Sequence, residues 1–283
     1  MIPVAIRAFN RPVMLDVTLK SVLASGVTPL VLDDCSDDPT TRAYLDTDDV
    51  ITLPEPLEWP AHAAWEQRVG RLATVRALRG IAGRVEGATA SERYGAQGAA
   101  FWAARYLFAR FPDAEAVCML ESDCVVAPGW YEELCSVAAE LAHVRRPDGD
   151  ALGILSAYHR MRVQTAGRYA WREGRTFRGA LDIGALAVLL TRTLFERAGD
   201  AFHRSWPVAA GGPDKQLIKC CWDAGCTIAA LTPSRVQHIG FRSIADPTIP
   251  PPDAWLSEHF ACPNAFAFEA RTPERVAYSP EWT

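Results

Sequence analysis

Near the start of the chain, short apolar runs alternate with segments in which apolar residues recur at helical spacing. A run rich in β-forming residues, residues 3–9, is followed by a polar loop and then by leucines and valines that recur at helical spacing. A second apolar run, residues 29–32, leads into an acidic turn and into residues 40–45, which suit the start of a helix. This order of strand, helix, strand and helix predicts an α/β fold with a parallel sheet.

The regular pattern lapses and then returns in the next part of the chain. Prolines interrupt residues 46–93, and within them residues 65–85 indicate one or two arginine-rich helices, so we interpret this stretch as an insertion. Helical spacing resumes from residue 95 to residue 111, and residues 116–120 have the pattern of another buried strand. Residues 184–190 form a later apolar run that predicts a further strand.

Two of the predicted strands end in carboxylates. Asp33 and Asp34 follow the second strand, and Glu121 and Asp123 follow the strand that begins at residue 116. Ligands of open α/β sheets bind at the carboxyl ends of the strands, and alternate residues of an extended segment lie on one side of it. A pair of carboxylates suits Mg²⁺ or Mn²⁺, which keep positions open for phosphate oxygens. The pattern therefore indicates a site that holds a nucleoside diphosphate through a divalent metal.

Composition narrows the class of protein without identifying it. The chain has 283 residues, of which 49% are hydrophobic and 22% charged, as is typical of a folded protein with one large domain or two closely joined ones. No apolar run approaches the roughly 20 residues of a membrane span, so we expect a cytoplasmic protein. The net charge of -5 argues against wholesale nucleic-acid binding. An arginine-rich run, residues 160–178, fits either an anionic partner or a solvated face. The eight cysteines include no CxxC pair, which predicts buried free thiols.

Five segments in their order along the chain carry a resemblance to a known family. They are residues 3–12, 30–36, 120–130, 184–190 and 233–240. Together they resemble the GT-A glycosyltransferases, especially the inverting family 2 enzymes and the related N-acetylglucosaminyltransferase I type. The resemblance implies an α/β, Rossmann-like GT-A fold, with a mixed, mostly parallel sheet flanked by helices.

The resemblance also implies how the chain is divided. Residues 1–240 correspond to the transferase domain, in which residues 1–130 form the half that binds the nucleotide sugar and residues 150–240 the acceptor and catalytic half. Residues 241–283 are rich in proline and aromatic residues and are expected to form an irregular extension. That extension either folds over the donor cleft as a lid or packs elsewhere on the domain.

The family's donor site is carried over to six positions. The residues that the resemblance implies for donor binding are Phe9, Arg11, Asp34, Glu121, Ser122 and Gly184. Asp34 is expected to bind the nucleoside base, commonly uracil, although a capping or turn aspartate explains it too. Arg11 is expected to contact the base or the diphosphate, or else is a surface arginine. The sequence has Ser122 where many relatives carry an acid, which puts the ribose contact in doubt.

The resemblance also implies a metal site and a catalytic base. Asp123 would be the direct ligand of Mn²⁺ or Mg²⁺, and His238 would complete the site, although a lone histidine is more often structural. Asp214, after two glycines and a proline, matches the general base that removes the proton of an acceptor hydroxyl in inverting transfer. A helix cap is the alternative for Asp214, and Asp182 is the second candidate for the base.

The expected activity is therefore transfer of a sugar from a nucleoside diphosphate donor, commonly a UDP-sugar, to an acceptor hydroxyl with inversion. The acceptor is open: a glycan, a lipid, a small molecule, a protein or a modified nucleobase. Two other classes fit the same donor half. A nucleotidyltransferase usually has an early glycine-rich phosphate loop, which this sequence lacks, and a sugar-nucleotide or glycan-binding protein without catalysis is the other alternative.

Overall fold

The computed structural model describes most of the first 240 residues. The described residues are 1–45, 50–52, 84–143, 151–158, 170–173, 176–179, 183–202, 212–231 and 234–238. Within them, ten strands form one sheet and two more form a short antiparallel ribbon. The expected extension, residues 241–283, the candidate base Asp182 and most of the arginine-rich run lie outside the described residues.

The large sheet is mixed and mostly parallel. Its strands in chain order are β1 Val4–Ala8, β2 Leu30–Asp33, β3 Val50–Thr52, β4 Arg84–Thr89, β5 Ala116–Glu121, β7 Ala151–Ser156, β8 Ala170–Glu173, β9 Thr176–Gly179, β10 Ala187–Thr191 and β11 Cys226–Leu231. Their order across the sheet is β3-β4-β2-β1-β5-β10-β7-β11-β9-β8. β3, β9 and β10 run against the others, and β10 separates β5 from β7.

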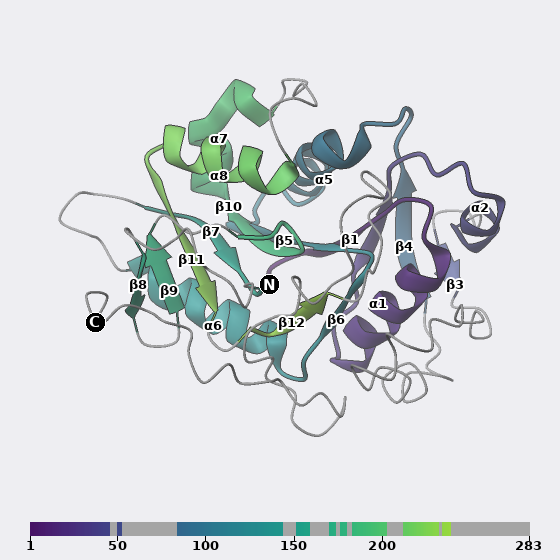
Figure 1. Cartoon of the computed structure of the whole chain (residues 1–283), viewed down its shortest axis with the longest axis horizontal. Helices are drawn as coiled ribbons and strands as arrows, with labels where there is room; N and C mark the ends of the chain where they lie inside the picture. The colour runs from purple at the N-terminus through teal and green to yellow at the C-terminus, as the bar shows by residue number, and fades with distance from the viewer. Residues whose placement is uncertain are drawn as a thin grey trace.

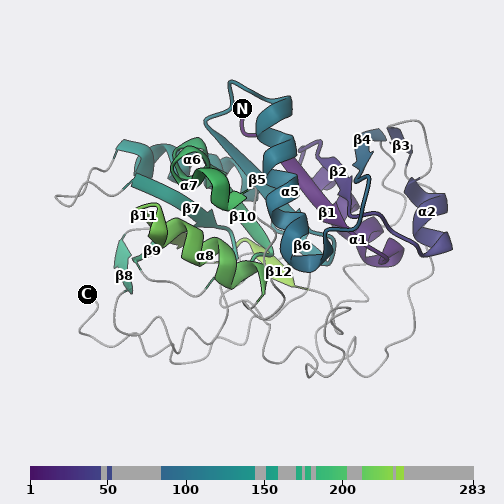
Figure 2. The same ribbon diagram turned by 90° about the horizontal axis from the view of Figure 1, so that it is seen from above.

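Helices cover both faces of this sheet. They are α1 Pro12–Ala24, α2 Pro39–Leu45, α5 Gly95–Arg110, α6 Trp130–His143, α7 Arg192–Ala198 and α8 Pro213–Asp223, with the 3-10 helix η2 at Gly199–Phe202. Figure 1 shows α5, α7 and α8 on one face and α1 and α6 on the other, and Figure 2 views the molecule from the side of α5, α7 and α8. The alternation of strand side chains gives each face its own core: Ile6 packs in the cluster under α1 and α6, and Ala5 in the cluster under α5 and α8. The α/β architecture that the sequence predicts, a mixed and mostly parallel sheet flanked by helices, is confirmed.

The local sequence explains where the first helix begins and ends. Pro12 occupies the start of α1, where its missing N–H removes no helical hydrogen bond. After the helix, Gly26 has a φ of 80°, a conformation that glycine adopts without strain. The apolar runs that predict strands at residues 3–9, 29–32 and 116–120 are β1, β2 and β5, each within one or two residues of the expected bounds.

One interpretation from the sequence is wrong. The prolines of residues 46–93 predict an irregular insertion, but residues 84–89 form β4, which pairs in parallel with β2 inside the sheet. Val85 is the one deeply buried apolar side chain of this strand, and Gly87 and Ala88 are too small to give an alternating pattern. The strand signal is therefore weak. The predicted helices over residues 65–85 are wrong at residues 84 and 85, which begin β4, and residues 65–83 lie outside the described residues.

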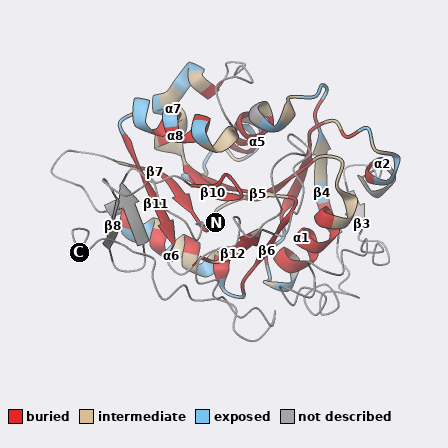
Figure 3. Cartoon of the chain, viewed as in Figure 1, coloured by how far each residue is buried: buried red, intermediate tan, exposed pale blue. Residues whose placement is uncertain are grey.

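The short two-stranded ribbon packs against α1. It consists of β6 Cys124–Val126 and β12 Val236–His238. The Thr18 hydroxyl of α1 donates to the carbonyl of Cys124 at 2.7 Å and accepts from its N–H at 3.1 Å. The helix packs on the sheet as well as on the ribbon, and it is buried from Met14 to Val22 (Figure 3). The turn between β5 and β6 is thereby held against a rigid support.

Most cysteines in the described part of the chain are buried, as the sequence predicts. The seven cysteines of the described residues carry thiols rather than disulfides; five of them are buried, whereas Cys35 and Cys135 are partly exposed. Cys262 lies outside the described residues. No helix in the described part of the chain combines the length and the apolar character needed to cross a membrane.

Candidate active site

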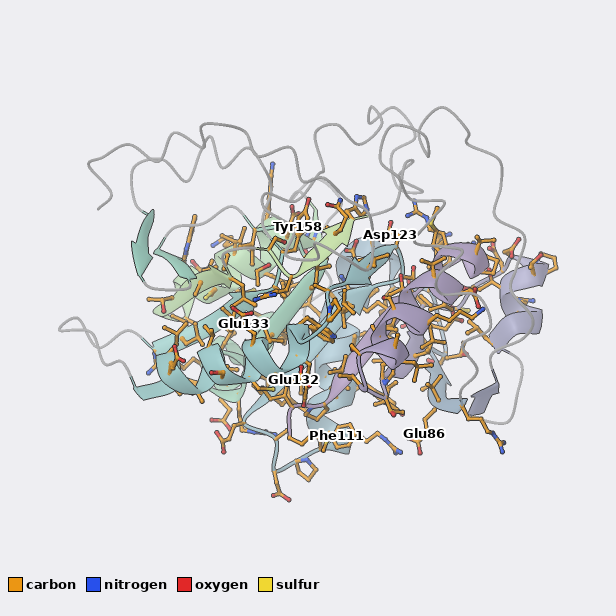
Figure 4. The ribbon with its side chains drawn as sticks, turned by 90° about the horizontal axis from the view of Figure 1, so that it is seen from below. Glu86, Phe111, Asp123, Glu132, Glu133 and Tyr158 are labelled. Carbon is orange, nitrogen blue, oxygen red and sulfur yellow. The ribbon has the colours of Figure 1, made fainter. Side chains whose placement is uncertain are left out.

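The acidic residues singled out in the sequence gather at one edge of the sheet. β2, β1 and β5 are parallel neighbours, so their carboxyl ends meet there. Asp34 follows β2, Glu121 ends β5, and Asp123 lies in the turn that leads into β6. Figure 4 shows Asp123 at this edge, with Glu86 and Phe111 at the opposite one. This edge is where open α/β sheets bind their ligands.

Pairing of the two ribbon strands brings His238 to Asp123. β12 pairs with β6 so that His238 lies opposite Cys124, the residue after Asp123. The His238 Nε2 is 3.1 Å from the Asp123 Oδ2, although 115 residues separate them in the chain. Asp123 is buried, with 5% of its surface exposed, and His238 is partly exposed. The two residues expected to hold a metal therefore lie side by side.

Arg11 meets the same carboxylate from the first loop. It is the N-cap residue of α1, and its guanidinium forms an ion pair with the Asp123 Oδ2. Asp123 thus joins three chain segments that the sequence keeps far apart. The expected contact of Arg11 with a donor stays a prediction, but an isolated surface arginine is excluded by this pairing.

The charges around Asp123 keep it ionised. Burial acts to raise the pKa of Asp123, but His238 and Arg11 outweigh it and hold that pKa well below its ordinary range. The second oxygen, Oδ1, is buried and has no hydrogen-bond donor among the described residues. A buried, ionised oxygen with no donor is a suitable ligand for a hard cation. No group of three or more candidate ligand side chains occurs in the described ranges.

Glu121 is engaged by an arginine that the sequence analysis does not single out. Arg7, buried within β1, donates from Nη2 to the Glu121 Oε1 at 2.9 Å and to the carbonyl of Ala185 at 2.9 Å. The Glu121 N–H donates to the carbonyl of Leu186 at 2.8 Å. Gly184 directly precedes this pair of carbonyls, so its segment lies next to the acidic turn. Burial raises the pKa of Glu121, and Arg7 acts against that rise. A buried arginine is rare unless it is paired, so the position of Arg7 inside an apolar strand is the feature of the sequence that could have indicated this ion pair.

Asp34 caps the start of α5. Its two carboxylate oxygens accept from the N–H groups of Tyr94, at 2.6 Å, and Gly95, at 2.8 Å. Burial raises the pKa of Asp34, although these two donors lower it. Tyr94 is the N-cap residue of α5, so Asp34 holds the start of a distant helix and is not itself an N-cap residue. These contacts do not test the expected contact with a nucleoside base. Ser122, between Glu121 and Asp123, is buried.

Two residues with left-handed backbone lie in the loops after β1 and β2. Asn10 has a φ of 47° and Cys35 a φ of 56°, which are uncommon for residues other than glycine. The Asn10 side-chain oxygen accepts from the N–H groups of Asp37 and Asp38, both at 2.9 Å, and so fastens the two loops together. Phe9, beside Asn10, lies under the guanidinium of Arg93 at 4.2 Å. Backbone strain of this kind clusters at functional sites, which supports a binding role for the edge.

Asp214 belongs to a different element at this edge. It lies in the first turn of α8, two residues after the N-cap residue Gly212, so the alternative of an N-cap aspartate is wrong. α8 is joined by two residues to β11 and packs on it, so its start lies toward the carboxyl ends of the strands. A carboxylate in a first helical turn is favoured by the helix dipole. A Cβ added to Gly212 would lie 2.7 Å from the Asp214 Oδ1, so the carboxylate is folded back over the glycine.

Comparisons with known proteins find similarity in structure only. No protein-family model matches the chain, and no curated protein matches it. Among solved structures, the chain is similar to TarS of S. aureus, with 12% identity over 82% of this chain and 58% of that chain, at a TM-score of 0.42. It is also similar to mannose-1-phosphate geranyltransferase from Thermus thermophilus, with 12% identity over 81% and 73% of the chains and a TM-score of 0.42. An active-site mutant of LgtC has 14% identity over 80% and 72%, at a TM-score of 0.35. These are distant likenesses, and the chain spans only 58% of the length of TarS in the first of them.

Proposed function

We propose that this chain is a glycosyltransferase that moves a sugar from a nucleoside diphosphate donor to an acceptor hydroxyl. The observation that carries the proposal is the contact of buried Asp123 with partly exposed His238 at the carboxyl end of β5, where one carboxylate oxygen of Asp123 has no donor among the described residues. The family resemblance supplies the class of reaction, and the site supplies residues that suit it. A UDP-sugar is the proposed donor, and the acceptor is an alcohol of unassigned class.

The proposed metal is Mn²⁺ or Mg²⁺, held by Asp123 and His238. These residues fit the ion because Asp123 is ionised and its Oδ1 is available, and because imidazole is a good ligand of Mn²⁺. When bound, the ion neutralises the negative charge of the departing diphosphate. Two protein ligands suffice, since such cations commonly retain water and bind substrate phosphates.

The chain's own residues would orient the donor around this ion. Phe9 and Asp34 flank the proposed position of the base, at the ends of β1 and β2. Glu121, Ser122 and the segment at Gly184 surround the proposed position of the donor sugar, where Arg7 fixes both Glu121 and the neighbouring carbonyl of Ala185. Asn10 ties the first two loops to each other, so the base and diphosphate ends of the donor would meet a fixed frame.

Asp214 is the proposed general base for transfer with inversion. It would accept the proton of the acceptor hydroxyl as that oxygen attacks the anomeric carbon. Its place at the start of α8 is a fixed one, because α8 packs on both β11 and α5. Asp182 remains the second candidate for this role.

The test measures release of nucleoside diphosphate from a panel of UDP-, GDP- and dTDP-sugars, with Mn²⁺ and with a chelator. We expect release from one donor class, dependent on the cation and strongly reduced in Asp123→Ala and His238→Ala. Arg110→Gln is the matched control, because Arg110 forms an exposed ion pair with Glu86 near the far end of α5. Full activity of Asp123→Ala in chelator would refute the metal assignment, and no turnover with any donor would refute the transferase.

A further inference from the structure

We infer that Arg11 and the divalent cation are alternative partners of Asp123, so that the metal enters the site together with the diphosphate rather than before it. Arg11 neutralises Asp123 in the free protein and moves onto the diphosphate when the metal complex of the donor binds. The inference rests on the proposed function and adds an order of binding and an exchange of partners to it. No covalent step is involved.

The contacts of Asp123 are the first step of the argument. Its Oδ2 contacts both the Arg11 guanidinium and the His238 Nε2, whereas its Oδ1 is buried without a donor among the described residues. A buried carboxylate needs a compensating charge, and Arg11 provides it permanently because guanidinium does not titrate in proteins. The free site is therefore already neutralised by a cation of its own.

A second cation on the same carboxylate meets an unfavourable field. A metal ion held by Asp123 and His238 would share this buried carboxylate with the Arg11 guanidinium, and the two positive charges would repel each other. A diphosphate removes this conflict, because its oxygens can bind the metal and accept from the guanidinium at the same time. Metal and diphosphate are thus expected to bind with strong positive coupling.

The geometry allows the arginine side chain to change partners without movement of its backbone. The Arg11 carbonyl accepts from the Leu15 N–H at 2.9 Å in the first turn of α1. The preceding residue, Asn10, is fixed by its hydrogen bonds to the loop after β2. The side chain of Arg11 is 18% exposed, against 7% for that of Asp123, so Arg11 is the more exposed member of the pair. Because the backbone at Arg11 is held in this way, the exchange of partners would be made by the side chain.

The experiment compares Mn²⁺ binding with and without nucleoside diphosphate. Free Mn²⁺ is followed by electron paramagnetic resonance during titration of the protein, first alone and then with saturating UDP. In the wild type we expect weak binding of Mn²⁺ alone and an affinity at least about tenfold higher with UDP, a coupling in the usual range between linked sites. This measurement needs no variant, so it remains valid if a substitution prevents folding.

Arg11→Gln should change the two affinities in opposite directions. Without the competing guanidinium, Mn²⁺ alone should bind about tenfold more tightly or better, whereas UDP in the presence of Mn²⁺ should bind about 10- to 100-fold more weakly, as expected for one lost charged hydrogen bond. Arg11→Lys keeps the charge and should leave the affinity for Mn²⁺ alone close to that of the wild type. Arg110→Gln is the control for loss of an arginine away from the site and should change neither affinity.

The outcomes separate the inference from the proposed function. If wild-type protein binds Mn²⁺ with UDP but binds Mn²⁺ alone equally well, or if Arg11→Gln gains no affinity for Mn²⁺ alone, the exchange of partners is wrong and the transferase proposal is unaffected. If the wild type binds neither Mn²⁺ nor any nucleoside diphosphate in the presence of Mn²⁺, the proposed function itself is wrong and the inference falls with it.

Discussion

Replacement of Arg7 by methionine should destabilise the fold through Glu121. Methionine keeps most of the length and apolar stem of arginine and removes its charge. Arg7 is 8% exposed, and its guanidinium joins β1 to the end of β5 and to the turn before β10. The substitution leaves the Glu121 carboxylate without its partner and the Ala185 carbonyl without this donor.

The expected loss follows from the burial of the pair. Removal of one partner from a fully buried ion pair costs about 3–5 kcal/mol, because the remaining charge stays desolvated. The Glu121 side chain is 31% exposed, so water can solvate part of the unpaired charge. We therefore expect a decrease of about 3 kcal/mol in the free energy of unfolding, the low end of that range.

A double-mutant cycle measured by urea unfolding checks this reasoning. The variants are Arg7→Met, Glu121→Gln and the two combined, and the double variant should be more stable than Arg7→Met because no unpaired charge remains. The matched control is the same cycle at Arg110 and Glu86, whose side chains are 44% and 56% exposed. That exposed pair should contribute about 1 kcal/mol or less. Additive losses at Arg7 and Glu121, within about 0.5 kcal/mol, would refute the coupling.

Three further predictions concern the carboxylates of the site. Asp34→Ala should reduce the free energy of unfolding by about 1–2 kcal/mol, because two N–H groups at the start of α5 lose their acceptor. The same substitution should raise the dissociation constant of the donor more than it lowers turnover. The pKa of Asp123 is lower in the folded protein than in the unfolded chain, so its ionised form stabilises the fold above about pH 4. In urea unfolding, the difference in free energy of unfolding between the wild type and Asp123→Asn should therefore decline as the pH falls below that value. Asp214→Asn should bind nucleotide sugar and metal almost normally, while transfer falls roughly 10²–10⁴-fold in single-turnover assays; unchanged transfer would leave Asp214 with a structural role at the start of α8.

The sequence predicts the parts of the fold that have strong local signals. The strands β2 and β5 are continuous apolar runs up to their final carboxylate, and β1 is apolar except for Arg7, as expected of strands with both faces covered. Helix α1 begins with a proline and is followed by a glycine two residues after its end. β4 escapes prediction because its Val85 has small or polar neighbours, and its place in the sheet depends on pairing with β2. Pairing between distant strands leaves no local pattern.

In the candidate site, too, the features with a local sequence signal are predicted and those that depend on pairing between distant segments are not. The carboxylates at the strand ends are evident from position alone, since the end of a buried strand is a predictable place. The approach of His238 to Asp123 depends on the register of β6 and β12, so only the family resemblance points to it. The Arg7 and Arg11 contacts depend on side-chain directions across strands, and neither is predicted from spacing.

The antiparallel strand β10 has a consequence for how the protein is synthesised. β5 pairs with β1 on one side and with β10 on the other, and these partners lie on opposite sides of it in the chain. Until residue 191 has left the ribosome, one edge of β5, flanked by the buried side chains of Val117 and Met119, has no partner strand. Unpaired apolar edges are templates for association with other chains. A fragment that ends at about residue 130 would leave this edge of β5 unpaired, and we expect it to aggregate rather than fold alone.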